Sequence, residues 1–454
     1  MTDFFVLLIS RLMDNLQVDQ TIFALASGAG KAGIAVFRIS GPSAADALRL
    51  ISKKQLFEPR HATRIQLTDP KSGDLLDESL AIFFPEPASF TGEDVVELHV
   101  HGGRAVIAGV TDVLADIKDV RLAEAGEFTR RAFEYGKFDL TAAEGLADLI
   151  NAETTAQRKQ AQRQLHGVLG VIYDDWRGRL LKAIALIEAE IDFSDEDLPQ
   201  GLHGQAAKEI GSIIGEVSDH LDDNGQGQVL RDGIYITIIG APNAGKSSLL
   251  NILSQRDAAI VSEKAGTTRD VIEVHLELNG YPLILADTAG LREVADDIES
   301  EGVRRAEERA QHADLKLAVF DGGVWPEKDF KTLQLIDKNT VVVINKSDLL
   351  KESSSEFIPV SAKTGDGLDV LLEVLKKEVA ERCHLSAAPA LTRTRHRTAL
   401  EECLANLQRF STTLETELNA ENLRLGARAL GRITGRVDVE EVLDIIFREF
   451  CIGK

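Results

Sequence analysis

The sequence of 454 residues has few cysteines and no long apolar run. Its three cysteines, Cys383, Cys403 and Cys451, follow no pairing pattern, which indicates a reducing compartment. The apolar run at residues 4–9 is far shorter than a membrane-spanning helix, and acidic residues on both sides of it argue against a signal or transit peptide. We therefore expect a cytoplasmic chain without a membrane segment.

Basic residues are scarcer than acidic ones, 51 against 73, so the formal net charge is −22. An acidic surface repels phosphate backbones, and this argues against a broad nucleic-acid-binding face. A role with RNA would need a local basic patch or a basic partner. The length of the chain is enough for about two to four domains.

Residues 240–248 read GAPNAGKSS and match the phosphate-binding pattern GxxxxGK[ST]. They follow an apolar run at residues 235–239 and open a helix-like segment at residues 247–253, which is the context that the motif requires. Backbone N–H groups of such a loop enclose the phosphates, Lys246 reaches the β- and γ-oxygens, and the Ser247 hydroxyl coordinates Mg²⁺. The pattern predicts a nucleotide site rather than an ordinary strand–turn–helix.

Three further motifs follow, each after a strand-like run. DTAG at residues 287–290 offers a carboxylate that can hold Mg²⁺ through water. NKSD at residues 345–348 offers Asp348, which can accept two N–H bonds from the guanine edge, whereas adenine has no matching donor pair. SAK at residues 361–363 fits the loop behind the base. The predicted nucleotide is therefore GTP.

GTTRD at residues 266–270 lies between the phosphate loop and DTAG, and Thr268 is a candidate second ligand of Mg²⁺. Together the motifs predict a Ras-like P-loop GTPase domain with a mostly parallel sheet. The residues expected to bind GTP are Asn243, Ala244, Gly245, Lys246, Ser247, Ser248, Ser262, Glu263, Lys264, Ala265, Gly266, Thr267, Thr268, Asp287, Thr288, Ala289, Gly290, Asn345, Lys346, Asp348, Ser361, Ala362 and Lys363.

One part of a Ras-like site is absent. Ras-like enzymes carry a glutamine directly after DxxG that orients the attacking water, and this chain has Leu291 there. Because leucine can neither accept a proton nor hold a water, hydrolysis must recruit another polar group, a cation, or both. Arg292, Glu293 and Glu299 are the nearby charged candidates, although each can equally be a solvated loop residue.

The segments around the GTPase motifs differ in period. Residues 20–137 read as α+β, with strand-like runs at residues 33–39 and 95–101, and residues 139–224 switch to helical spacing. The DDNGQG segment at residues 222–227 then predicts a helix end and a linker. Apolar positions recur every three or four residues at Ile172, Trp176, Leu180, Ile184, Ile187 and Ile191, and form a second stripe at Ile210, Ile213, Ile214, Val217 and Leu221.

Helical spacing resumes after the GTPase block, and Asp438 with Glu441 resembles a capping box before the last helix. The economical interpretation is one helical domain, residues 139–231 with 390–454, interrupted by an inserted GTPase domain, whose termini would lie close together. Two separate helical modules remain the alternative. The apolar positions are Leu400, Leu404, Leu407, Phe410 and Leu414, then Val442, Ile445, Ile446 and Phe450.

Nearly the whole chain after residue 18 resembles the MnmE (TrmE) family of bacterial tRNA modification GTPases, which act with a flavoprotein on the wobble uridine. GTTRD inside a GTPase, together with a terminal CIGK, is a specific combination. The matching blocks are FTGEDVVEL at residues 90–98, HGG at 101–103, GEF at 126–128, GKFDL at 136–140, GTTRD at 266–270 and CIGK at 451–454.

The resemblance implies three domains and two kinds of protein partner. An α+β domain at residues 19–138 would bind folate and hold a homodimer. A discontinuous helical domain at residues 139–231 and 390–454 would enclose the GTPase domain at residues 232–382. The other partner is an FAD-binding, MnmG (GidA)-like protein in a heterotetramer, and tRNA would be bound through that complex.

The cofactor implied in the first domain is a tetrahydrofolate derivative in its 5-formyl or methylene form. Its contacts would be Arg38, Glu97, Lys137 and the terminal Lys454. Arg and Lys can pair with the glutamate tail or the formyl group, and a carboxylate can accept from pterin N–H groups. Residues 27–31 read SGAGK where the family usually has PPGRG. They imitate a phosphate-loop fragment but lack its leading glycine and its final Ser or Thr, so we do not expect a nucleotide site there.

For the missing glutamine the resemblance implies a K⁺ ion near the β- and γ-phosphates, in place of an arginine finger. The attacking water would be oriented by Glu299 through a second water, with Arg292 stabilising the loop. The expected K⁺ ligands are the Asn243 side chain and the backbone carbonyls of Ser262, Lys264 and Thr267.

The reaction implied is transfer of a folate one-carbon unit to C5 of the wobble uridine, followed by addition of glycine or ammonia, which yields a carboxymethylaminomethyl-type group. Cys451 is a candidate nucleophile, although a near-terminal cysteine is more often incidental. A ribosome-assembly GTPase is the runner-up, but it would be expected to carry a basic KH or OB module. A GTP-gated scaffold with vestigial hydrolysis is the third reading.

Overall fold

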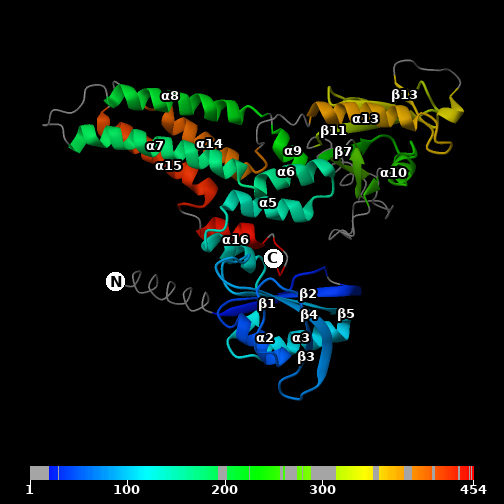
Figure 1. Ribbon diagram of the computed structural model, residues 1–454. Helices are drawn as coiled ribbons and strands as arrows, with labels where there is room; N and C mark the ends of the chain where they lie inside the picture. The colour runs from blue at the N-terminus through cyan, green and yellow to red at the C-terminus, as the bar shows by residue number, and fades with distance from the viewer. Residues whose placement is uncertain are drawn as a thin grey trace, which may run out of the picture. The chain divides into compact units, whose positions relative to one another are not determined.

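The computed structural model forms two compact units, Met1–Ala147 with Gly431–Lys454, and Asp148–Leu430 (Figure 1). These units divide the chain differently from the four segments expected from the sequence, because the end of the chain groups with the N-terminal part. The apolar run at residues 4–9 and the capping residue Asp438 lie outside the described residues. The structure describes residues 20–28, 30–192, 202–223, 225–255, 259–260, 273–278, 280–287, 313–350, 357–382, 391–411, 415–437, 440–448, 450 and 452–453.

The first unit contains a six-stranded sheet in the order β3-β4-β5-β2-β1-β6. Neighbouring strands are antiparallel except for β1 and β6. Side chains alternate between the two faces of a strand, so Leu98 of β5 is buried in the core while Glu97 lies on the other face. The strands are β1 (Thr21–Leu25), β2 (Ala32–Ser40), β3 (Thr63–Thr68), β4 (Leu75–Phe84), β5 (Val95–Gly102) and β6 (Val120–Leu122).

The two larger apolar clusters of this unit involve its helices. Helices α2 and α3 pack on the sheet, and Leu48 and Leu114 are fully buried there beside Phe37. The apolar faces of α4, α5 and α16 meet in a second cluster, where Gly126 approaches Phe447 so closely that a Cβ would lie 2.4 Å from the Phe447 carbonyl oxygen. The helices are α2 (Ala44–Ser52), α3 (Arg104–Ala115), α4 (Glu127–Glu134), α5 (Leu140–Asn151) and α16 (Glu440–Arg448).

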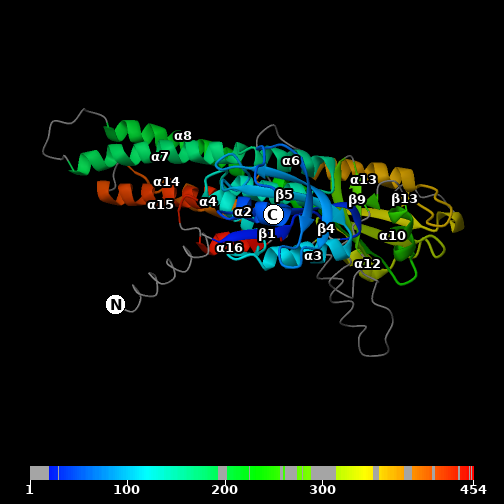
Figure 2. The same ribbon diagram turned by 60° about the horizontal axis from the view of Figure 1, so that its bottom comes forward.

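Long helices α7, α8, α14 and α15 run beside one another in the second unit (Figures 1 and 2). The ring of Tyr173 on α7 packs against Trp176 and His220, and its hydroxyl lies 3.1 Å from the His220 Nε2. Within the described residues no helix is both long and apolar enough to cross a membrane. The helices are α6 (Thr155–Leu165), α7 (Val168–Asp192), α8 (Leu202–Leu221), α9 (Gln226–Asp232), α14 (Thr394–Leu407) and α15 (Thr416–Thr434).

Several helix boundaries differ from those predicted. The expected linker at residues 222–227 already contains the start of α9, which follows Gly225 at a φ of +71°. The apolar spacing also ran past the ends of α14 and α16. Phe410 lies beyond α14, where its ring stacks on His203, and Phe450 is buried beyond the end of α16. Helix α15 lies within the predicted helical region, but no apolar stripe was identified for it, since its buried positions include small alanines.

The inserted GTPase part is a seven-stranded sheet in the order β13-β12-β11-β7-β10-β9-β8. Strands β13 to β10 are parallel and β9 and β8 antiparallel, which confirms the mostly parallel sheet. The elements are β7 (Ile234–Ile239), α10 (Lys246–Ser254), β8 (Ala259–Ile260), β9 (Glu273–Leu278), β10 (Tyr281–Asp287), β11 (Leu315–Asp321), α12 (Phe330–Gln334), β12 (Thr340–Asn345), a 3₁₀ turn (Ser347–Leu349), β13 (Ile358–Pro359) and α13 (Leu368–Arg382).

One carboxylate ties both connections of the GTPase part to the helices. The Asp148 Oδ1 accepts from the Arg231 Nε at 3.1 Å and from an Arg393 terminal nitrogen at 2.8 Å. Arg231 lies in the last turn of α9, just before β7, and Arg393 immediately precedes α14, after the GTPase part. Entry and exit of the insertion therefore meet at the end of α5.

Candidate nucleotide and folate sites

The phosphate-loop motif occupies the turn between β7 and α10 and requires glycine at two places. A Cβ at Gly240 would lie 2.4 Å from the Val319 carbonyl oxygen, and one at Gly245 would lie 2.1 Å from the Asn345 Nδ2. Gly245 also has a φ of +90°, and Asn243 has a φ of +63°, a conformation that asparagine tolerates better than most residues. Few other sequences could adopt this backbone conformation, because it requires glycine at two positions and a positive φ at a third.

Lys246 begins α10 and folds back over the loop. Its Nζ donates to the carbonyl oxygens of Gly240 and Ala241, both at 2.9 Å, and the residue is only 7% exposed. Ser247 and Ser248 are exposed in the first turn of α10. The N-terminus of this helix, a buried ammonium and an exposed hydroxyl thus lie together, which suits the binding of a phosphate with its Mg²⁺.

Asn345, at the end of β12, joins the phosphate loop to the SAK loop. Its Nδ2 donates to the Ala244 carbonyl oxygen at 3.0 Å, and its Oδ1 accepts from the Ala362 N–H at 3.1 Å. The residue is 1% exposed. Both ends of its amide are therefore used in holding these two loops together.

Lys346 makes a second connection to the phosphate loop. Its Nζ donates to the Asn243 carbonyl oxygen at 2.8 Å and pairs with the Asp321 Oδ2 at 2.6 Å. Burial by itself would raise the pKa of Asp321, but the hydrogen bonds from Lys346 and the Gly323 N–H outweigh it and lower that pKa. Sequence reasoning missed Asp321, although it ends the apolar run of β11 in the same way that Asp287 ends β10.

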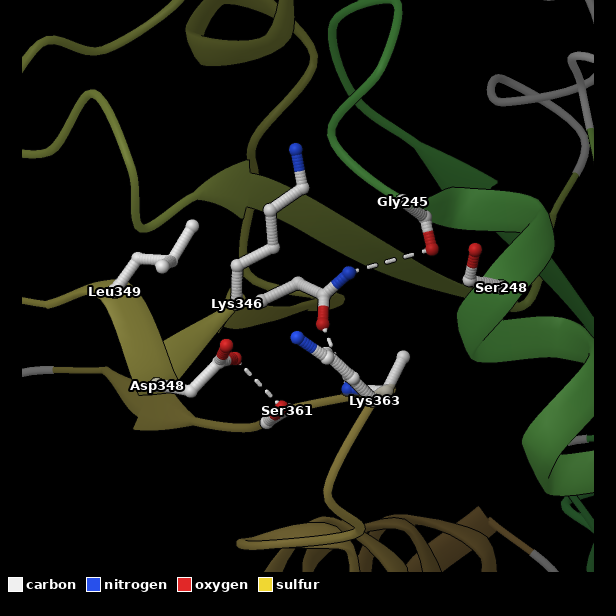
Figure 3. A pocket seen from close by; sticks show the side chains of 9 residues that line it. Gly245, Ser248, Lys346, Asp348, Leu349, Ser361 and Lys363 are labelled. Carbon is white, nitrogen blue, oxygen red and sulfur yellow. Dashed lines mark hydrogen bonds between the residues drawn. The ribbon is translucent and has the colours of Figure 1, made fainter.

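A cavity of about 300 Å³ opens beside these loops (Figure 3). The Ser361 hydroxyl donates to the Asp348 Oδ1 at 2.7 Å and so orients the carboxylate on which guanine selectivity is predicted to depend. Sequence reasoning missed Leu349, an exposed leucine on the wall. The cavity is lined by Gly245, Ser248, Asn345, Lys346, Asp348, Leu349, Ser361, Ala362 and Lys363.

The structure describes only some of the remaining residues that are predicted to bind the nucleotide or a cation. The backbone of Asp287 ends β10 beside Ile238 of β7, one strand from the phosphate loop. Outside the described residues lie Ser262, Glu263, Lys264, Ala265, Gly266, Thr267, Thr268, Thr288, Ala289, Gly290, Leu291, Arg292, Glu293 and Glu299.

Arg38 and Glu97 are brought together in the first unit. They are register partners on the central strands β2 and β5, and an Arg38 terminal nitrogen lies 2.9 Å from the Glu97 Oε1. The guanidinium carbon lies 5.2 Å from the centre of the Phe90 ring and 5.9 Å from that of Phe128. The pair is thus half-buried in the sheet. The Phe90 ring, from the loop between β4 and β5, and the Phe128 ring, from α4, lie beside the guanidinium.

Lys137 and the end of the chain lie in the same unit. The Lys137 Nζ donates to the Pro87 carbonyl oxygen, in the loop that leads to Phe90. Ile452 forms an antiparallel bridge with Ala125, and a Cβ at Gly453 would lie 2.4 Å from the Leu25 carbonyl oxygen at the end of β1. Cys451 and Lys454 are outside the described residues.

Comparisons with known proteins agree over nearly the whole chain. A family model described as "GTP-binding protein TrmE N-terminus" matches residues 21–137, and one described as "MnmE helical domain" matches residues 140–451. Similar proteins include the tRNA modification GTPases MnmE of Paramagnetospirillum magneticum, 56% identical over 443 residues, and of Parvibaculum lavamentivorans, 53% identical over 439. The protein of the same description from Rickettsia bellii is 47% identical over 444 residues, and each match covers 96% of this chain and 100% of the relative.

Proposed function

The chain belongs to the MnmE family of tRNA modification GTPases, and from this premise we propose its chemistry: it installs a carboxymethylaminomethyl-type group at C5 of the wobble uridine. Family membership makes it a GTP-hydrolysing enzyme of tRNA modification. The one-carbon unit would come from a tetrahydrofolate derivative, and the redox step would belong to an FAD-containing partner.

The observation that carries the nucleotide assignment is the convergence of three loops on one cavity. The phosphate loop, the Asn345–Asp348 motif and the Ser361–Lys363 motif come from three different strand ends, and Asn345 joins them. Ligands of open α/β sheets bind at the carboxyl ends of the strands, where such loops lie. We assign GTP to this site, with the base beside Asp348 and the phosphates at Lys246.

Hydrolysis without the usual glutamine is proposed to depend on a monovalent cation. Asn243 would contribute its side chain to K⁺, and when bound the ion supplies positive charge near the β- and γ-phosphates. Ser247 and Thr268 would hold Mg²⁺, and Glu299 would orient the water. The exposed Asn243 in the phosphate loop supports this proposal.

Turnover of GTP in K⁺ and in Na⁺ tests the cation. Fast hydrolysis in K⁺, slow hydrolysis in Na⁺ and similar GTP affinity in both salts are expected, and Asn243→Ala should remove the difference. Equal turnover of the wild-type protein in both salts would exclude a K⁺-specific role.

Glu299→Ala should lower kcat by roughly 10²-fold or more while GTP still binds.

A folate site is proposed around Arg38 and Glu97, with Lys137 and Lys454 as further contacts. Aromatic rings flank the guanidinium, Ile452 bridges Ala125, and Gly453 lies against the end of β1, the strand next to β2. Deletion of residues 451–454 should preserve GTP hydrolysis and eliminate wobble-uridine modification. Full modification by the truncated protein would exclude the tail from the site. Loss of modification in Cys451→Ser with retained folate affinity would support a chemical role for the thiol.

The proposed assembly is a homodimer held by the N-terminal domain, which joins an MnmG-like partner in a heterotetramer in the cytoplasm. The proposed folate-binding domain comprises residues 19–138, the helical domain residues 139–231 with 390–454, and the GTPase domain residues 232–382. Mass spectrometry of tRNA nucleosides from a deletion strain, with and without the restored gene, tests the reaction. An unchanged nucleoside profile in the deletion strain would overturn the assignment.

A further inference from the structure

Three segments of this acidic chain run for sixteen or more residues without Asp or Glu while containing at least three Lys or Arg: residues 154–173, 382–400 and 422–437. With a net charge of −22, any contact with a phosphate backbone must use a surface from which carboxylates are locally excluded. These segments are the places to look for such a surface, and the structure separates them by what their side chains contact.

In two of the segments, several arginines are paired with carboxylates from elsewhere in the second unit. Arg393 pairs with Asp148 at 2.8 Å, and Arg397 pairs with Asp223. Arg424 pairs with Glu188 at 2.6 Å. These guanidinium groups stabilise the helical part, and their charge is already neutralised.

The third segment forms α6 and is different. Arg158, Lys159 and Arg163 are exposed, and within the part of the chain that the structure describes none of them forms an ion pair. At 100° per residue, the outer arc of α6 carries these three cations with Thr155, Gln162 and His166 and has no carboxylate. The opposite arc is buried and consists of Ala156, Gln160, Ala161 and Gln164.

The basic face is held rigidly. Thr154 and Gln157 form a capping box at the start of α6, in which the Thr154 side chain accepts from the Gln157 N–H at 3.3 Å. On the inner side, the Ala156 N–H donates to the Gly280 carbonyl oxygen at 3.1 Å, and Gln164 accepts from the Thr392 hydroxyl at 2.9 Å. Helix α6, which carries the cations, lies between the long helices and the GTPase part (Figure 1).

We propose that the outer face of α6, defined by Arg158, Lys159, Arg163 and His166, contacts the phosphate backbone of the tRNA. This inference rests on the proposed function, which makes tRNA the polyanion that this protein meets. Arg158 and Arg163 are about 7.5 Å apart along the helix axis, so they reach separate positions on a strand rather than one phosphate. Such contacts position the RNA without reading its sequence.

The proposed RNA-binding helix also contacts the GTPase part. The inner side of α6 rests on the hairpin of β9 and β10, where the His275 Nδ1 also lies 3.0 Å from the Glu153 Oε2. Strand β10 ends at Asp287, in the predicted Mg²⁺ motif. RNA on the outer face would therefore be one helix away from an element that reaches the nucleotide site.

The test is tRNA binding by the full-length protein as a function of salt, with an unmodified transcript whose wobble base is uridine. The variant carries Arg158→Gln, Lys159→Gln and Arg163→Gln together. We expect the affinity for tRNA to fall about tenfold. The slope of log affinity against log salt should be reduced in magnitude by about 2 to 3, because each lost phosphate contact removes about 0.7 to 0.9. The rate of GTP hydrolysis should not change, since these residues lie outside the nucleotide site.

Two controls make the outcome decisive. Replacing the exposed Lys118, Lys338 and Lys377 with Gln changes the net charge equally and should leave the slope unchanged, while Arg158→Lys with Arg163→Lys should retain most of the binding. An unchanged slope in the α6 variant, an equal loss in the lysine control, or weaker binding of the flavoprotein instead of tRNA would each overturn the proposal. If the wild-type protein binds no tRNA but restores modification in a deletion strain, this face is excluded while the proposed function stands.

Discussion

In the GTPase part, Asn345, Lys346 and Ser361 each connect two different loops, whereas in the first unit Arg38 and Glu97 connect two neighbouring strands. Loops at the ends of parallel strands diverge, so side chains that bridge them enclose a cavity of about 300 Å³. Two charges within a sheet lie directly side by side and neutralise each other. The first arrangement borders a cavity, whereas in the second the two charges are already paired with each other.

The largest expected effect comes from breaking the connection between the loops. Asn345→Ala removes a buried amide that serves Ala244 and Ala362, and each buried group left without a partner costs about 1–3 kcal/mol. GTP affinity should fall by about 10²-fold or more, and the melting temperature should fall with it, as measured by nucleotide titration and thermal unfolding.

The matched variant Asn345→Asp separates the two sides of that amide. It keeps the acceptor for the Ala362 N–H and removes the donor to the phosphate loop, so its loss should be intermediate. Wild-type affinity in Asn345→Ala would mean that these hydrogen bonds do not organise the site.

The next effect concerns specificity. Asp348→Asn replaces the carboxylate that is proposed to accept two N–H groups from guanine with an amide that also donates, so GTP binding should weaken by about 10²-fold. Preference should shift towards xanthosine triphosphate, measured as the ratio of the two dissociation constants. A variant that still prefers GTP would show that the base is read by another residue.

A smaller effect, on folate affinity, is expected from changes to the Arg38–Glu97 pair. Arg38→Gln or Glu97→Gln should weaken binding of 5-formyltetrahydrofolate about tenfold, measured by calorimetry, without changing GTP turnover. The exposed pair of Arg64 and Glu78 on the same sheet is the control, and replacing both with Gln should leave folate affinity unchanged. If both pairs behave alike, the Arg38–Glu97 pair is only structural.

The smallest effect is expected at Asp321. Its pKa is lowered below the usual 3.8, so the stabilisation from its pair with Lys346 is present above that value and is lost only as pH falls through the folded-state pKa. Asp321→Asn should weaken GTP binding a few-fold, by the same factor at pH 5.5 and pH 8. A loss that grows between those pH values would require another titrating group.

The nucleotide residues were predictable because they form local motifs with characteristic spacing. GAPNAGKSS, NKSD and SAK each lie directly after an apolar run, and the structure places all three beside one cavity. Asp321 and Leu349 were missed because neither belongs to such a motif: Asp321 reaches the phosphate loop only through Lys346, and Leu349 is an ordinary exposed leucine that the fold places on the cavity wall. For the proposed folate site, the resemblance supplied Arg38 and Glu97, but their direct pairing depends on strand register.

The sequence by itself determined the order of the elements, the GTPase motifs and the interrupted helical region, because strand and helix periods and glycine requirements are local properties. Only the tertiary structure decided which charges are neutralised. Arg393 and Arg231 meet Asp148 across more than eighty residues of chain, whereas Arg158 and Arg163 meet no described carboxylate. Charge pairing depends on which helices pack together, and the burial of small and apolar side chains sets that packing through contacts distant in sequence.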